Sequence, residues 1–129
     1  MTERPYGEFP LREFLGMEVV PATEGHATAH LEVGPEHLNP NDVVHGAVLF
    51  ALLDTAMGSA AMSVLEEGRF ATSVDIQIRF VRPATTGRLV AEVEVLKRGR
   101  HVIHLDGRVT DDQGTTIATA AGTFTIFSV

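Results

Sequence analysis

The stretch GAVLFALLDTAMGSAAMSVL, residues 46–65, decides the fold of this chain. Small and apolar residues fill it, and Asp54 is its only charged residue. A buried carboxylate costs free energy unless it is paired or hydrogen-bonded, so its presence needs an explanation. We take catalysis as the leading interpretation of Asp54, with a structural hydrogen bond to a strand hydroxyl as the alternative.

The same stretch is expected to form one long buried helix. The polar loop HLNPNDVV, residues 37–44, offers Asn41 or Asp42 as the helix cap, and we expect the helix to continue to about Leu65. Its length would suit a membrane span, but an acid at its centre would cost about 2.5–3.5 kcal/mol there. We therefore expect a helix buried within a soluble domain and no membrane partner.

The rest of the chain has the patterns of strands and turns. Residues 11–15 favour a short helix closed by Gly16, and residues 17–33 favour a β-hairpin that turns at Gly25. Two-residue alternation then predicts long strands over residues 72–80, 89–96, 102–110 and 116–127. Strands of this length indicate an antiparallel sheet that curves around the one long helix.

Strict alternation also assigns faces to the first of these long strands. Ser73 would then share a face with Asp75, Gln77 and Arg79, while the other face carries the residues Thr72, Val74, Ile76, Ile78 and Phe80. A register error of one residue would exchange the two faces.

Length, composition and charge exclude several classes of protein. With 129 residues, 44% hydrophobic and 21% charged, the sequence predicts one soluble domain over residues 1–129. The chain has no cysteine, which excludes disulfides and a cysteine nucleophile and suits a reducing cytoplasm. Its net charge of −7 argues against nucleic-acid binding.

Two further patterns bear on location and on metals. The N-terminus carries charges that include Glu3 and Arg4 and has no apolar signal core, so we expect a cytoplasmic protein. His26 and His30 share a face of a predicted strand, but no third ligand follows at a suitable spacing. We therefore expect no metal site.

Three segments carry a resemblance to a known family: HLNPNDVVHGAVLFALLDTAMGSAAM, SVDIQIRFVRPATTGRLVAEVEVLKRGR and DDQGTTIATAAGTF. Over about residues 15–127 the chain resembles the hotdog-fold thioesterases, specifically the phenylacetyl-CoA thioesterase (PaaI-like) branch. The resemblance implies an α+β hotdog fold, in which a five- or six-stranded antiparallel sheet wraps one central helix. It also implies an acyl-CoA substrate, no separate cofactor, and a homodimer or homotetramer.

Carried over by position, the resemblance assigns five site residues. Asp54 would be the general base or the nucleophile, and Gly46 would offer its backbone N–H to the thioester carbonyl. His45 and Asn39 would support that end of the site, and Ser73 would orient the attacking water. The Asp that stands at the helix position favours the phenylacetyl-type branch, because the related hydroxybenzoyl-type branch commonly has Glu there.

Several of these residues also have a structural interpretation. His45 could cap the helix or pack in the loop, and Asn39 could organise the loop through bonds to its backbone. Thr72 could replace Ser73 if the strand register differs by one residue. The family pattern Gly-x-x-His-Gly-Gly also differs here, because Asp42 and Ala47 stand where the family has its first and last glycines.

The distance along the helix bears on how such a site could be assembled. A helix N-terminus supplies unpaired N–H groups that stabilise a developing oxyanion. Asp54 lies eight residues after Gly46, about 12 Å along a helix axis and roughly 80° around it. The two groups could not reach one carbonyl carbon within one chain, so we expect the site to be shared by two subunits.

A small basic cluster is the candidate for binding the coenzyme A phosphates. It comprises Lys97, Arg98, Arg100 and His101, and Arg82 is a further candidate at the end of another strand. A solvated hairpin turn is the alternative interpretation of this cluster.

The expected function is hydrolysis of an aryl-acetyl or medium-chain acyl-CoA to the free acid and coenzyme A. A non-hydrolytic acyl-CoA binding or sensing module of the same fold is the alternative, although it would not need Asp54. A hotdog hydratase is a weaker alternative, because its motifs are not visible in the sequence.

Overall fold

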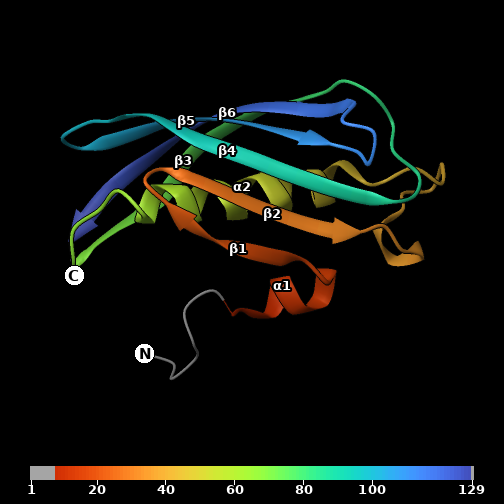
Figure 1. The fold of residues 1–129 in the computed structure, drawn as a ribbon, viewed down its shortest axis with the longest axis horizontal. Helices are drawn as coiled ribbons and strands as arrows, with labels where there is room; N and C mark the ends of the chain where they lie inside the picture. The colour runs from red at the N-terminus through yellow and green to blue at the C-terminus, as the bar shows by residue number, and fades with distance from the viewer. Residues whose placement is uncertain (1–7, 129) are drawn as a thin grey trace.

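Six antiparallel strands curve around one long helix in the computed structural model, which describes residues 8–128 (Figure 1). Glu3 and Arg4, on which the prediction of an N-terminus without a signal core partly rests, lie outside this range. The elements in chain order are α1 (Pro10–Leu15), β1 (Glu18–Thr23), β2 (His26–Glu32), the 3-10 turn η1 (Pro35–His37), α2 (Gly46–Met62), β3 (Arg69–Phe80), β4 (Arg88–Arg98), β5 (Val102–Thr110) and β6 (Thr116–Ser128).

The strands form one sheet in the order β1-β2-β4-β5-β6-β3, so β1 and β3 are its edges. Every neighbouring pair is antiparallel. The helix α2 lies against one face of this sheet, which curves around it (Figure 1). The predicted α+β architecture, a long antiparallel sheet around one central helix, is confirmed.

Apolar burial holds α2 in place. Eight of its side chains are buried: Val48, Leu49, Leu52, Leu53, Ala56, Met57, Ala60 and Ala61. Burial of each large apolar side chain is worth about 1.5–3 kcal/mol. The alanines let the helix approach the sheet closely, and the remaining side of α2 carries Asp54 and Ser59, which are only partly buried.

Two glycines bring the sheet against the helix. A Cβ at Gly107 would lie 2.7 Å from Cγ1 of Val93 and 3.0 Å from Cδ2 of Leu53. A Cβ at Gly122 would lie 2.6 Å from Sδ of Met57. Larger residues at these two positions would push α2 away from the sheet.

The ends of α2 differ from the sequence expectation. The cap is neither Asn41 nor Asp42 but His45, whose side chain accepts a hydrogen bond from the Ala47 N–H. The helix ends at Met62 rather than near Leu65. The helix ends here because the side chain of the next residue, Ser63, makes two hydrogen bonds. Its hydroxyl donates to the Ala60 carbonyl and accepts from the Gly25 N–H. These bonds tie the end of the helix to the β1–β2 turn.

The faces of β3 also differ from strict alternation. Ser73 pairs with Phe124 and Asp75 pairs with the adjacent Thr123, so Val74 is an extra residue in a β-bulge. Ser73 therefore shares the helix-facing side with Ile76, and the expectation that it lies beside Asp75, Gln77 and Arg79 is wrong. The expectation failed because the bulge adds one residue to the count.

We predict opposite stability effects for two Gly→Ala substitutions. Gly107→Ala should lower the free energy of unfolding by about 1–3 kcal/mol, because the new methyl group meets Val93 and Leu53. Gly58→Ala should raise it by up to about 1 kcal/mol, because Gly58 is inside a helix and its nearest neighbour would be 3.8 Å away. Urea unfolding of the two variants measures both changes, and equal effects would contradict the packing argument.

Candidate active site

A groove of about 710 Å³ opens beside Asp54. Its walls come from α2 and the adjoining Ser63, from β1 and from β3, with Phe124 from β6 and Phe9 from just before α1. The lining is largely apolar and includes Val19, Val20, Pro21, Ala22, Met62, Ala71 and Phe124, while its polar side chains include Asp54, Thr55, Ser59 and Ser73. A groove of this kind suits an apolar ligand with one reactive polar group.

The carboxylate on the groove wall is electrostatically perturbed. Burial raises the pKa of the Asp54 side chain above its usual value, and hydrogen bonding to the Ser73 hydroxyl acts in the opposite direction. Asp54 is only partly buried, contrary to the full burial that its apolar surroundings in the sequence suggest. A carboxylate with a raised pKa is a stronger base, and the groove gives it access to a ligand.

The start of α2 leaves one backbone donor free. The Ala47 N–H donates to Nδ1 of His45 at 2.9 Å, and the Val48 N–H donates to the His45 carbonyl at 2.9 Å. Within residues 8–128, the Gly46 N–H has no hydrogen-bond partner. This N–H lies at the positive end of the helix dipole, so it can donate to a ligand oxygen.

The loop before α2 organises its own backbone. The Asn39 side-chain oxygen accepts from the Asn41 N–H at 2.8 Å and from the Val43 N–H at 3.3 Å. Asp42 has φ of 62°, the left-handed region that a glycine adopts most easily and that Asp tolerates. The loop therefore keeps a glycine-like conformation at the position where the family pattern has its first glycine.

Sequence reasoning missed one histidine in this loop. His37 is buried, with 1% of its surface exposed. Its Nδ1 accepts from the Gly34 N–H at 2.9 Å, and its Nε2 donates to the Leu15 carbonyl at 2.8 Å. The sequence carried no separate signal for this role, because His37 stands in a polar loop like an exposed residue.

The predicted phosphate-binding residues lie at both ends of α2. The guanidinium of Arg98 binds both carboxylate oxygens of Glu66, at 3.0 and 3.1 Å, just beyond the end of the helix. The exposed Lys97 and Arg100 flank it. Arg82 donates to the Thr116 carbonyl at 3.0 Å, in the region where the chain enters α2.

The structure therefore divides the predicted site residues into three places. Asp54 and Ser73 meet in the groove, whereas Gly46, with the nearby residues His45, Asn39 and Arg82, lies at the start of α2. The basic turn with Lys97, Arg98 and Arg100 lies at the other end of the helix, where β4 and β5 connect (Figure 1).

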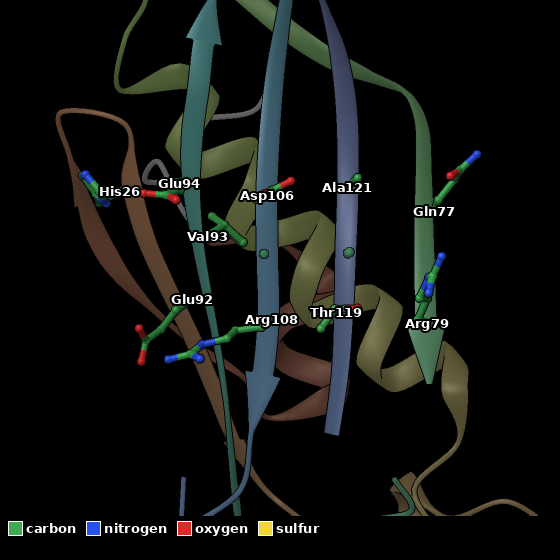
Figure 2. Close-up of a pocket in the computed structure, with 12 residues that line it drawn as sticks. His26, Gln77, Arg79, Glu92, Val93, Glu94, Asp106, Arg108, Thr119 and Ala121 are labelled. Carbon is green, nitrogen blue, oxygen red and sulfur yellow. The ribbon is translucent and has the colours of Figure 1, made fainter. Parts of the chain in front are cut away.

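A second groove, of about 730 Å³, lies on the sheet face away from α2 (Figure 2). Its side chains are mostly polar or charged and include His26, Glu92, Glu94, Asp106, Arg108 and Arg79. It contains none of the predicted site residues. Among residues 8–128 no three His, Asp or Glu side chains are grouped as metal ligands, and none of the helices there could cross a membrane.

Comparisons with known proteins agree with the fold. Residues 41–118 match the thioesterase superfamily. The acyl-coenzyme A thioesterase PaaI of Escherichia coli is 31% identical over 109 residues, which cover 84% of this chain and 76% of that protein. The conserved protein PA5202 of Pseudomonas aeruginosa superposes with a TM-score of 0.90 at 25% identity, covering 98% of this chain and 100% of that one.

A third comparison concerns a ligand. The hypothetical thioesterase of Streptococcus pneumoniae TIGR4, whose crystal structure was determined with coenzyme A, superposes with a TM-score of 0.79. The two chains are 22% identical, and the match covers 87% of this chain and 86% of that chain. This likeness concerns the fold.

We predict that Asp54→Asn stabilises the protein at neutral pH. Because the pKa of Asp54 is raised in the folded protein, ionisation of this carboxyl lowers the free energy of unfolding. This destabilisation is fully present above the raised pKa, and it is absent below the unfolded pKa of about 3.9. The Tm of the variant should exceed that of the parent at pH 8, and the difference should shrink as the pH falls toward 4. Asp75→Asn is the control on the outer face, and a lower Tm for Asp54→Asn at pH 8 would contradict the prediction.

Proposed function

Because this chain belongs to the thioesterase superfamily, we propose that it is an acyl-CoA thioesterase, which hydrolyses the thioester to the free acid and coenzyme A. One observation carries the proposal. The groove presents a carboxylate of raised pKa, and the start of the same helix presents a free backbone N–H. Thioester hydrolysis needs a base or nucleophile on one side of the carbonyl carbon and an oxyanion donor on the other.

In the proposed mechanism Asp54 acts on the thioester carbonyl carbon. As a general base it removes a proton from an attacking water, and the C–S bond then breaks so that the thiolate of coenzyme A leaves and takes up that proton. As a nucleophile it attacks the carbon itself and displaces the thiolate, and water then hydrolyses the resulting acyl–Asp54 anhydride to the free acid and supplies the proton that the thiolate takes up. The Ser73 hydroxyl orients the water or the carboxylate, since it lies beside Asp54 in the groove and lowers the pKa of that carboxyl. The Gly46 N–H stabilises the oxyanion, while His45 and Asn39 keep the other donors of the loop occupied.

The proposed site is shared by two subunits of a homodimer. Gly46 and Asp54 are about 12 Å apart along the axis of α2, too far to act on one carbon. The edge strand β3 has no further strand beside it in the sheet, and it exposes Val74 and Phe80. An unpaired edge strand with exposed apolar side chains favours pairing with another chain, which would bring Asp54 of one subunit near Gly46 of the other. A homotetramer of two such dimers belongs to the same proposal.

The proposed substrate is an aryl-acetyl or medium-chain acyl-CoA. The apolar walls of the groove, formed by side chains such as Val19, Val20 and Met62, support a hydrophobic acyl group. The likeness to PaaI supports the phenylacetyl-type branch. Lys97, Arg98, Arg100 and Arg82 are the proposed contacts of the coenzyme A phosphates, and the thioesterase structure that contains coenzyme A supports this type of ligand.

We predict that Asp54→Ala lowers kcat for acyl-CoA hydrolysis by about 10²- to 10⁴-fold, the range for loss of a general base. Release of free thiol from phenylacetyl-, hexanoyl- and palmitoyl-CoA measures the reaction. Asp75→Ala, which removes an exposed acid from the edge strand β3, should keep the parent rate. The proposal is wrong if the parent turns over none of these thioesters or if Asp54→Ala keeps the parent rate.

Mixed dimers test the sharing of the site. One subunit carries Asp54→Asn and the other carries Gly46→Val, with different affinity tags for purification. If each site takes Asp54 from one subunit and Gly46 from the other, one site lacks the carboxylate and has its N–H blocked, and the second stays intact. The mixed dimer should then keep about half of the parent activity, whereas each mutant homodimer is inactive. An inactive mixed dimer would show that each subunit uses its own two groups.

A further inference from the structure

The aromatic ring of Phe80 covers the start of α2. A Cβ built on Gly46 would lie 2.9 Å from Cζ and 3.0 Å from Cε1 of this ring. The space beside the Gly46 Cα is therefore filled by Phe80 and is not open to a ligand. Within residues 8–128, the three nearest side-chain atoms to that position all belong to the Phe80 ring.

The position of Phe80 follows from the regular alternation of β3 beyond its bulge. Beyond Val74 the strand alternates regularly, so Phe80 faces the same side as Ile76 and Ile78, toward α2. It is the last residue of the strand. One side of its ring meets Gly46, and 57% of its surface is exposed. A large apolar side chain thus stands beside the free N–H with half of its surface available for contact.

We propose that Phe80 determines specificity at the thioester carbonyl by limiting the bulk of the acyl group next to that carbonyl. The inference rests on the proposed function, in which the Gly46 N–H receives the carbonyl oxygen. An oxygen bound there brings the adjacent acyl carbon within reach of the Phe80 ring. A second carbon substituent on that acyl carbon, as in a branched acyl group, must share the space with the ring. Unbranched acyl groups are therefore favoured.

The contact also couples position 46 to Phe80. Any side chain at position 46 must displace the Phe80 ring, which lies closer than ordinary van der Waals contact allows. Gly46→Ala should therefore lower activity when Phe80 is present. Removing the ring in a Gly46→Ala, Phe80→Ala double variant should restore part of the loss, because the two positions are directly coupled.

The test compares butyryl-CoA with isobutyryl-CoA, which differ by a branch beside the carbonyl. We expect Phe80→Ala and Phe80→Leu to lower the ratio of kcat/KM for butyryl-CoA over isobutyryl-CoA, by about 10-fold or more for Phe80→Ala. Phe127→Ala is the matched control, because this exposed ring stacks on Phe70 at the other end of the β3–β6 pair. Its ratio should equal that of the parent.

Each outcome separates this inference from the proposed function. If the parent hydrolyses both thioesters and the two Phe80 variants keep its ratio, Phe80 does not determine specificity and the thioesterase proposal stands. If the parent hydrolyses no thioester, the proposed function fails and the inference fails with it. Light scattering shows whether each variant keeps the parent assembly. If Phe80→Ala loses the parent assembly, the kcat/KM ratio of Phe80→Leu decides whether Phe80 determines specificity.

Discussion

The close packing of α2 on the sheet is the constraint on which the rest of the structure depends. Gly107 and Gly122 leave the sheet without side chains where the helix crosses it. The buried alanines of α2 keep the side chains on the facing side of the helix short. One face of α2 is therefore buried in the core. The carboxylate of Asp54 falls on the remaining side, where β1 and β3 curve past the helix and leave the groove. The position of the acid thus follows from how the helix is buried.

A second consequence concerns hydrogen bonding at the start of the helix. Asn39, His37 and His45 each satisfy backbone groups of the loop or of the helix cap. These bonds make the loop rigid and use the N–H groups around Gly46, while that of Gly46 itself stays free. The residues that build the loop are therefore separate from the group that can meet a ligand, and a polar residue near a site need not touch the substrate.

The sequence predicted the large elements well because they depend on periodic burial. Alternation along β4, β5 and β6 and the long apolar run of α2 are repeated signals, and their elements appear where the pattern indicated. Two local features were missed, the bulge at Val74 and the buried His37, and the cap at His45 was foreseen only as one of its alternative roles. Each depends on one or two local hydrogen bonds or on one extra residue, and such features leave no periodic pattern in the sequence. Asp54 was identifiable because a lone charge in an apolar helix breaks a pattern.

The bulge in β3 has a consequence for assembly as well as for the groove. Because β3 is an edge strand, its outer side can accept a strand from another molecule. Val74 interrupts the regular spacing of that edge, dividing it into the segment before the bulge and the segment after it. A second strand can therefore add in only a few registers, and a long uninterrupted ladder, the kind that grows into fibres, is disfavoured. One unpaired residue thus narrows the ways in which copies of the chain can associate.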